Sequence, residues 1–509
     1  MSTQEQLKGS YTKEEPLSDG DAAESGPGPA EGIVMDWTPR EEAAVRHKTD
    51  FILLPILGLA FFALQLDRGN ISAALTSTIT TDLGIDTNQI NVGTQLLSAG
   101  IVITEIPSNI ILQRIGPQRW LAGQLFAWGL VATFQAFVKT YPAYLATRIL
   151  LGLFEGGFIP GALYYISTWY KRDETSLRIT FFFFGQIFAG ATTSLISAGL
   201  LKLSGKGGLA GWQWIFLVEG LITIFAATVF VLLLPPRVGN GRPLASFGRW
   251  SYFTERESRI IQHRVLLDDP RKARGHIKIT GRNIIDTVRQ PRVIQHFFIT
   301  LVSMSAVQGL TQYTPTMIKS LGFSAVRANA LTSVPVYCSM VILVILSYLS
   351  DKFGHRGPAV LFGATWNVIT YACFRGTSVH SSRWHRYGVI VAADLFYAGV
   401  HVLNVGWLSF YCKTPQERSV AMALVVMAAN ASGISGSQIF RTSDAPLYRH
   451  ALTAVCALAG VAWVQVLALN LQSWYFQSKQ KKNQVVVASE TGTDSTEVGL
   501  PSSEWESEK

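Results

Sequence analysis

Apolar residues are concentrated in long blocks along the chain, and short polar segments separate one block from the next. A helix that crosses the hydrocarbon core of a bilayer needs about 20 mostly apolar residues, and each block has room for one such helix. The pattern therefore predicts twelve transmembrane helices. They cover residues 50–72, 90–113, 119–138, 142–169, 177–201, 213–235, 293–317, 328–350, 358–375, 387–411, 418–440 and 450–476.

The polar segments divide these blocks into two groups of six. The segment 236–292 is much longer and more polar than the others, and Thr254 and Glu257 within it have the spacing of a capping box, which predicts a short helix. We therefore expect a half over 50–235, a central loop, and a half over 293–477. The ends, 1–49 and 478–509, read as disordered tails.

Composition and charge support an integral membrane protein. The chain has 509 residues, of which 48% are hydrophobic and 15% charged, whereas a soluble domain carries about 25% charged residues. The net charge of +9 comes from Lys and Arg between the blocks, concentrated on one side of the predicted membrane. By the positive-inside rule both termini are cytoplasmic, so the basic residues indicate orientation in a lipid bilayer and no nucleic-acid partner.

The two predicted halves share a local pattern. Residues 109–119, after the second block, and residues 347–356, after the eighth, both read as a helix end followed by polar, basic and Gly positions in a tight turn. A repeat at corresponding places of two six-helix halves indicates a transporter whose binding site lies near the membrane midplane.

At this point the chain resembles the major facilitator superfamily, whose loop signature G-x-x-x-D-[RK]-x-G-x-[RK] it repeats. The second copy keeps most of the signature, but the first has Gln113 in place of the acid and Asn109 in place of the first Gly. The resemblance implies an all-α fold of twelve transmembrane helices in two six-helix halves, with a cytoplasmic gate at these turns. The matching gate residues are Arg114, Gly116, Asp351, Lys352, Gly354 and Arg356.

More narrowly, the chain is similar to the anion:cation symporter branch and, within it, to the fungal allantoate permease-like family. The segments that carry this likeness are 66–71, 105–109, 148–161, 211–220, 429–433 and 444–448. Family substrates are small organic acids, among them allantoate, nicotinate and pantothenate, and the usual location is the plasma membrane, with a monomer as the default state.

Four charged residues within the predicted spans are the main candidates for chemistry. Arg148 and Glu155 share one helical face, while neighbours Asp67 and Arg68 diverge by about 100°. A charge inside a membrane costs about 2.5–3.5 kcal/mol on insertion scales, so it persists mainly where it works or pairs. The alternatives are a structural ion pair for the first two residues and an outer helix end, close to water, for the last two.

The resemblance implies proton coupling for Asp67 and contact with an anionic substrate for Arg68, while the charge cost in the fourth span predicts that Arg148 binds a substrate carboxylate and Glu155 carries a proton. Physically, a protonated acid would release a buried Arg to bind the substrate carboxylate, so proton and anion would favour each other's binding. Further expected substrate contacts are Gln186 and Asn430, from the resemblance, and Gln308 and Tyr313, from their place on the seventh span.

Other polar residues in the spans are expected to be structural. Glu105 is assigned to packing or gating, and Pro160 to a bend or to carbonyl groups that line a cavity. Asp394 and His401 are predicted to share a face of the tenth span, and a lone intramembrane His is more often structural than a proton relay.

The sequence favours proton-coupled uptake of a small carboxylate over three alternatives. Carriers that export drug-like metabolites usually have a Gly- and Pro-rich fifth span, and no Pro lies between Pro160 and Pro235. Nutrient sensors on this fold tend to have longer tails and to lose the coupling acids. No nucleophile, metal or phosphate motif supports a membrane enzyme, so we expect no catalytic activity, cofactor or metal.

Overall fold

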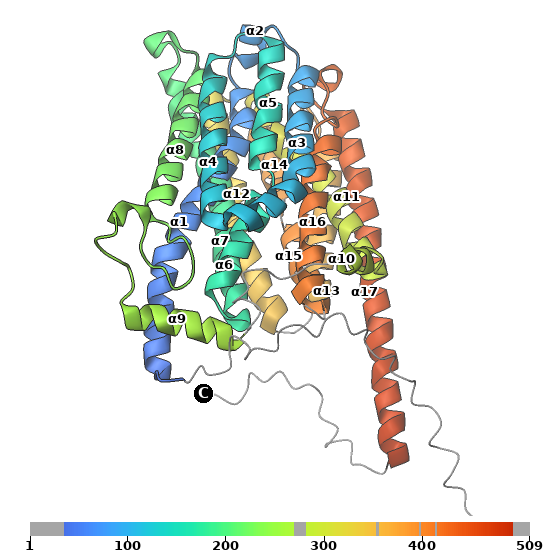
Figure 1. The fold of residues 1–509 in the computed structure, drawn as a ribbon. Helices are drawn as coiled ribbons and strands as arrows, with labels where there is room; N and C mark the ends of the chain where they lie inside the picture. The colour runs from blue at the N-terminus through green and yellow to red at the C-terminus, as the bar shows by residue number, and fades with distance from the viewer. Residues whose placement is uncertain (1–34, 269–280, 353–355, 397–398, 413–414, 492–509) are drawn as a thin grey trace, which may run out of the picture.

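The protein is all-helical over the residues that its computed structural model describes, which are 35–268, 281–352, 356–396, 399–412 and 415–491 (Figure 1). The helices lie roughly side by side as a bundle, with α2 (Ile79–Leu83) at the top of the view and α9 (Glu255–Asp268) at the bottom. We call these two ends of the bundle the α2 side and the loop side.

The first half of the chain forms seven long or medium helices. α5 and α6 lie in one predicted span, separated by Gly156 and Gly157. The helices are α1 (Pro39–Ala74), α3 (Thr87–Ile115), α4 (Pro117–Phe134), α5 (Tyr141–Glu155), α6 (Phe158–Trp169), α7 (Arg172–Leu200) and α8 (Gly211–Leu233).

The second half repeats this plan after the central loop, in which α9 and α10 (Gly281–Val288) lie. Its tenth predicted span is also divided, between α14 and α15. The helices are α11 (Pro291–Ser320), α12 (Ala325–Lys352), α13 (Arg356–Gly376), α14 (Arg383–Asp394), α15 (Gly399–Tyr411), α16 (Pro415–Gly436) and α17 (Arg449–Thr491).

The predicted spans all correspond to helices. Within the described ranges, nine helical stretches are long and apolar enough to cross a membrane. The other three predicted spans correspond to α4, α13 and α16, and α16 is apolar over the shorter stretch Val420–Gly436. The protein is therefore a multi-pass membrane protein.

Helices extend into both predicted tails. α1 begins at Pro39, where Thr38 and Glu41 form a capping box, so residues 39–49 are helical. α17 continues to Thr491, past the predicted start of the C-terminal tail at residue 478. The apolar pattern located the membrane-buried part of each helix but not its polar ends, because a cap and charged side chains extend a helix beyond the hydrocarbon core.

Small residues allow α3 and α5 to pack with their backbones in contact. A Cβ atom on Gly152 would lie 2.2 Å from the carbonyl oxygen of Leu97, and one on Gly156 would lie 2.0 Å from the Thr104 hydroxyl. The helix breaks at Gly156 and Gly157, where Gly157 has a φ of 81°, rather than at the predicted Pro160. A left-handed residue interrupts the helix there, while Pro160 fits into the first turn of α6.

The predicted capping box in the central loop is present at the start of α9. The Thr254 amide donates to Glu257 Oε2 at 2.8 Å, and the Glu257 amide donates to Thr254 Oγ1 at 3.2 Å. α9 docks on the first half through Arg264, whose fully buried guanidinium donates to both carboxylate oxygens of Glu174 at 3.0 and 2.9 Å.

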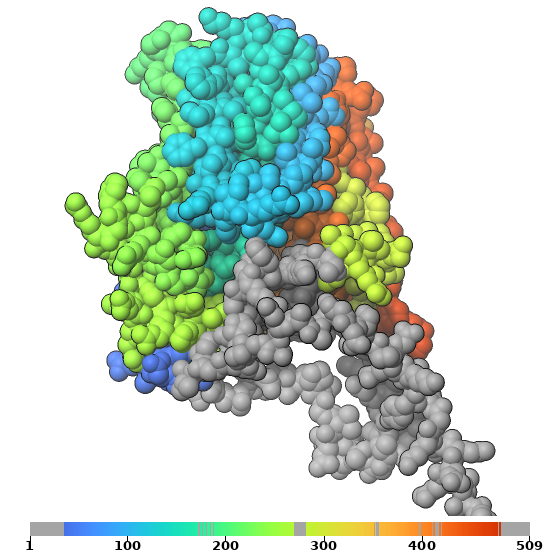
Figure 2. Space-filling model, viewed as in Figure 1, coloured from blue at the N-terminus to red at the C-terminus, as the bar shows by residue number. Residues whose placement is uncertain are grey.

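The two halves of the bundle lie side by side, the first in blue to green and the second in yellow to red (Figure 2). On the α2 side they are joined through Asn91 of α3, which donates to the Phe440 carbonyl at 2.8 Å and accepts from the Tyr313 hydroxyl at 2.5 Å. Lys319 Nζ donates to the Thr76 carbonyl at 2.6 Å nearby. We call this set of contacts the α2-side seal.

Candidate functional site

A cavity of about 220 Å³ lies between the two halves, below the α2-side seal. Helices α1, α3, α5 and α7 of the first half and α11, α12, α14 and α16 of the second half contribute to its wall. Its polar lining comes from both halves: Arg68, Ser72, Thr94, Ser98, Arg148, Thr193, Ser194, Gln308, Thr311, Gln312, Thr314, Thr332, Asp394 and Asn430. This position is the one that the two-half repeat predicts for a substrate.

Arg68 lines the cavity and is held by a buried acid. Its Nε donates to Glu155 Oε2 at 2.8 Å, and the Glu155 side chain is fully buried while Arg68 is 24% exposed. Glu155 is the last residue of α5, so the helix break that follows it places its carboxyl opposite α1. The pair therefore joins a buried acid to a base that faces the cavity.

Arg148 is a buried base without a carboxylate partner among the described residues. Only 2% of the residue is exposed, and its Nε and Nη2 atoms have no hydrogen-bond partner. Its guanidinium carbon lies 5.2 Å from the Tyr144 ring centroid and 5.6 Å from that of Phe216. Aromatic faces stabilise a cation but leave its N–H donors free, so Arg148, a lining residue of the cavity, keeps buried donors that no described residue uses.

Asp67 does not line the cavity. Its side chain points from α1 toward α8, is fully buried, and accepts a hydrogen bond from the Thr223 hydroxyl at 2.9 Å. The predicted divergence of Asp67 and Arg68 is thus present, with the base at the cavity and the acid between helices. The alternative that both lie in water at a helix end does not fit this burial.

The second half contributes amides and one acid. Gln308 and Asn430 line the cavity, as the sequence predicted, and Asp394 lines it as well. Asp394 is 4% exposed and accepts from the Thr314 hydroxyl at 2.8 Å. From the sequence, Asp394 was expected to share a helical face with His401 and to be structural, since a lone intramembrane His is more often structural than a proton relay. The shared face is wrong, because α14 ends at Asp394, and Asp394 faces the cavity.

Two predicted substrate contacts lie elsewhere. Tyr313 is 1% exposed and belongs to the α2-side seal through its hydrogen bond to Asn91. Gln186 of α7 is partly buried and is not among the residues that line the cavity. Glu105 is 3% exposed and packs where α3 meets Gly157, which agrees with the expected packing role.

The predicted gate residues lie at the loop side. Gly116 has a φ of 98° and connects α3 to α4, while Arg114 is exposed at the end of α3. Arg356 donates to the Gly406 carbonyl at 2.7 Å, and Lys352 is exposed at the end of α12. Gly354 and the side chain of Asp351 lie outside the described residues, so the ion pairing expected at this turn stays a prediction.

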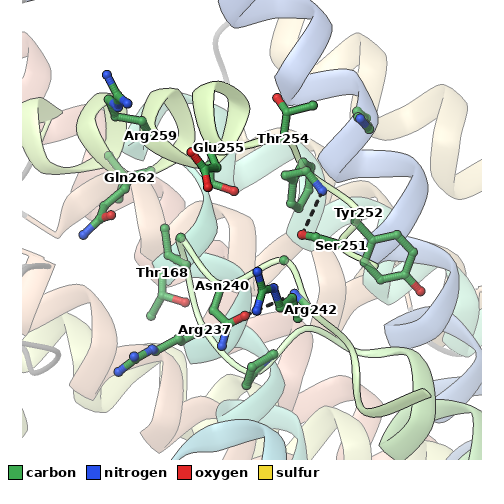
Figure 3. Close-up of a pocket in the computed structure, with 18 of the residues that line it drawn as sticks. Thr168, Arg237, Asn240, Arg242, Ser251, Tyr252, Thr254, Glu255, Arg259 and Gln262 are labelled. Atoms are coloured by element: carbon green, nitrogen blue, oxygen red, sulfur yellow. Dashed lines mark hydrogen bonds between the residues drawn. The ribbon is translucent and has the colours of Figure 1, made fainter. Parts of the chain in front are cut away.

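A larger hollow, of about 1500 Å³, lies on the loop side between α6, α9 and residues 236–253. Figure 3 shows Arg242 beside Asn240, whose side-chain oxygen accepts from the Arg242 amide at 3.1 Å. Its lining comes from the first half and the central loop only. It therefore lacks the access from both halves that alternating access requires, and the smaller central cavity is the better candidate for a transport site.

No group of three or more His, Cys, Asp or Glu side chains is placed to hold a metal ion in the described part of the chain. What the central cavity offers instead is two guanidinium groups, one of them held from behind by Glu155, together with amides, hydroxyls and the carboxyl group of Asp394 from the opposite half. Such a lining suits a small anion with additional hydrogen-bonding groups.

Comparison with known proteins gives one family. The family model described as Major Facilitator Superfamily matches residues 57–437. An uncharacterized transporter of Saccharomyces cerevisiae is 28% identical over 415 residues, covering 81% of this chain and 76% of the relative. An uncharacterized transporter of Schizosaccharomyces pombe is 27% identical over 469 residues, covering 91% and 92%.

Solved structures show the same fold. The partially occluded, inward-open xylose transporter XylE from E. coli matches with a TM-score of 0.61 and 16% identity, over 81% of this chain and 97% of the other. At this identity the match supports the architecture and says nothing of the substrate.

Proposed function

Because the chain belongs to the major facilitator superfamily and is a secondary transporter, we propose that it carries a small organic carboxylate together with protons. The observation that supports this most strongly is Arg148, a buried guanidinium with two unpartnered N–H donor atoms at the wall of a cavity between the halves. A buried cation without an ion-pair partner among the described residues is costly, and a carboxylate would supply both a paired charge and the acceptors.

The Arg68–Glu155 pair provides the coupling step of this proposal. While Glu155 is ionised, it holds Arg68 at 2.8 Å. A proton on Glu155 removes its charge, weakens that hydrogen bond, and leaves Arg68 free to bind the substrate. Anion and proton then favour each other's binding, and by linkage the effect is reciprocal.

The second half supplies the remaining contacts in this proposal. Gln308, Thr311 and Asn430 line the cavity opposite the two Arg residues, so an anion that binds both walls draws the halves together. This would convert occupancy into the closure that alternating access needs. Acids with an amide or ring nitrogen, such as allantoate- or nicotinate-like compounds, match both walls and fit the likeness to the allantoate permease-like family.

Orientation follows from the charge pattern. We take the loop side to be cytoplasmic, because the basic segments gather there, and the plasma membrane to be the location. The hydrogen bonds that join described residues of the two halves lie on the α2 side or near the middle of the bundle. On this assignment the structure is sealed toward the outside, as expected for a carrier that releases substrate inward, and a monomer contains the whole site.

Uptake of labelled carboxylates into proteoliposomes, with and without an inward proton gradient, tests the proposal. Accumulation of one carboxylate only with the gradient is the expected result and would identify the substrate. If no carboxylate accumulates in vesicles with correctly oriented protein, the proposal fails, and export of a larger metabolite or a sensing role becomes the better account.

A further inference from the structure

A second group of buried polar side chains lies between α1, α7 and α8, and extends from Asp67, the chain neighbour of Arg68, toward the α2 side. Its members are Asp67 and Asn70 of α1, Ser197 of α7, and Glu219 and Thr223 of α8. All five have an exposed fraction of 0%. No role was expected for Glu219 from the sequence, and the cavity lining does not include it.

Hydrogen bonds connect the two acids of this group, Asp67 of α1 and Glu219 of α8, to hydroxyl groups of neighbouring helices. Thr223 of α8 donates to Asp67 Oδ2 at 2.9 Å, and Ser197 of α7 donates to Glu219 Oε1 at 3.1 Å. Glu219 precedes Thr223 by one helical turn, so both side chains lie on the same face of α8. Asn70 follows Asp67 by about one turn in the antiparallel helix, which brings it to the level of Glu219.

Acceptors outnumber donors in this group. Asp67 Oδ1, Asn70 Oδ1 and Glu219 Oε2 are buried oxygens without a hydrogen-bond partner, and Asn70 Nδ2 is an unpartnered donor beside them. The indole N–H of Trp128 is close to Asp67 but lacks hydrogen-bond geometry. A buried polar group without a hydrogen-bond partner is destabilising, so the described side chains alone do not account for the stability of this arrangement.

Charge leads to the same conclusion. No ion pair joins Asp67 or Glu219 to a base among the described residues, although the field of Arg148 reaches Asp67. The charged groups that act on the pair are otherwise acids: Glu155 acts on Asp67, and Asp67 acts on Glu219. Two carboxylates so close in a dry interior cannot both stay ionised at reasonable cost.

We propose that Glu219 and Asp67 form a second proton site, in which bound protons turn the surplus acceptors into donors toward Asn70 and each other. A proton on each acid makes the group neutral, and Asp67 connects it to the coupling pair because its chain neighbour is Arg68. The site would deliver protons to the central cavity from the α2 side while the seal stays closed. The delivery of protons to the cavity rests on the proposed symport, whereas the binding of protons by Asp67 and Glu219 does not depend on it.

Infrared spectroscopy of the full-length protein in lipid tests the proposal without a substrate, through the carbonyl-stretch band of protonated carboxyl groups at neutral pH. The Glu219→Gln variant should lose part of this band. Thr223→Val should shift the part that belongs to Asp67, because it removes a hydrogen bond. Glu255→Gln, which changes an exposed acid on α9, should leave the band unchanged.

Three results would overturn the proposal. One is a band of equal intensity in wild type and Glu219→Gln. Another is an unshifted band in Thr223→Val. This variant tests the proposal even if Glu219→Gln does not fold. The third is loss of the wild-type band when sodium chloride replaces choline chloride, since the group would then hold sodium rather than protons. Failure of proton-driven uptake with these spectra intact would overturn the symport proposal alone.

Discussion

At the scale of single residues, charge cost in the membrane selected side chains that the structure buries or places at the central cavity. Asp67, Arg148 and Glu155 are all at most 2% exposed, and Arg68 faces the central cavity. The two bases differ in their partners, and in the proposed function this difference lets one site both bind an anion and couple its transport to protons. Arg68 forms an ion pair with Glu155, whereas Arg148 has two donor nitrogens without a hydrogen-bond partner among the described residues.

Replacement of Arg148 by Lys should abolish high-affinity substrate binding although the charge stays. The planar guanidinium can donate two parallel hydrogen bonds to a carboxylate, and an ammonium cannot reproduce them. We expect affinity to fall about 10- to 100-fold, the equivalent of about 1.5–3 kcal/mol, in a binding assay with the transported anion. Arg249→Lys, in the exposed central loop, is the matched control, and wild-type affinity in the Arg148 variant would make that residue structural.

The sequence could find these residues but not their partners. Arg68 and Glu155 are 87 positions apart, and nothing in the pattern of either helix indicates that α5 ends where it meets α1. Asp67 and Thr223 meet across a still longer separation. For the same reason Tyr313 was predicted at the substrate, because its helix could be located but its rotation toward the seal could not.

At the scale of elements, the fourth and tenth predicted spans are each two helices, and each first helix ends at an acidic residue. Glu155 ends α5 and Asp394 ends α14. A break frees backbone groups and directs the last side chain inward, which a continuous amphipathic pattern would not do. Apolar periodicity predicted one continuous helix in each case, since Gly interrupts a helix without changing its hydrophobicity.

Substitution of Gly152 by Ala should destabilise the protein by separating α3 from α5. The new Cβ would lie 2.2 Å from a backbone oxygen of Leu97, which cannot rotate away as a side chain would. Overpacking of this kind costs about 1–3 kcal/mol, and thermal unfolding in detergent should show a lower Tm. Gly123→Ala, whose Cβ meets nothing within 4 Å, should leave the Tm unchanged or raise it; equal Tm values for both variants would contradict this packing.

The docking of α9 should weaken in acid. Burial alone would raise the pKa of Glu174, but the hydrogen bonds and charge of Arg264 lower it below the usual 4.5. A lowered folded-state pKa stabilises the docked state above the usual value, and this contribution is lost as the pH falls below 4.5 through the folded value. The protection of α9 amides against hydrogen exchange, measured relative to the intrinsic exchange rate at each pH, should therefore fall on acidification.

An Arg264→Gln variant should show fast exchange in α9 already at pH 7, because about 1.5–3 kcal/mol of charged hydrogen bonding is lost. Arg259→Gln on the same helix, with an exposed side chain, should behave as wild type. If the Arg264 variant keeps the same protection of α9 amides as wild type at pH 7, and this protection does not change with pH, apolar packing alone holds α9.

At the scale of the whole molecule, the all-α fold of membrane-spanning helices was predictable from the apolar pattern. The conformational state was not, because one sequence pattern serves every state of a carrier. The contacts between the two halves decide the conformational state, and here they include the α2-side seal around Asn91.

Asn91→Ala should open the seal. The substitution removes a donor to the Phe440 carbonyl and the acceptor of the Tyr313 hydroxyl, which together contribute about 1–3 kcal/mol. Thr81 and Arg441 are both exposed on the α2 side and can carry spin labels. Pulsed electron–electron double resonance between these labels should show a population at longer distance that wild type lacks. Asn88→Ala, at the exposed edge of the seal, should have a smaller effect, and identical distributions for Asn91→Ala and wild type would place the closure elsewhere.

The measurement that tests the account most directly compares two modes of transport in Glu155→Gln proteoliposomes, with the carboxylate that wild type accumulates. Glutamine mimics the protonated acid, so Arg68 stays available to the anion while the proton can no longer be carried. The account predicts that accumulation driven by a proton gradient is lost, while exchange of labelled for unlabelled anion across the membrane continues. Gradient-driven accumulation at the wild-type level would show that Glu155 does not couple proton and anion.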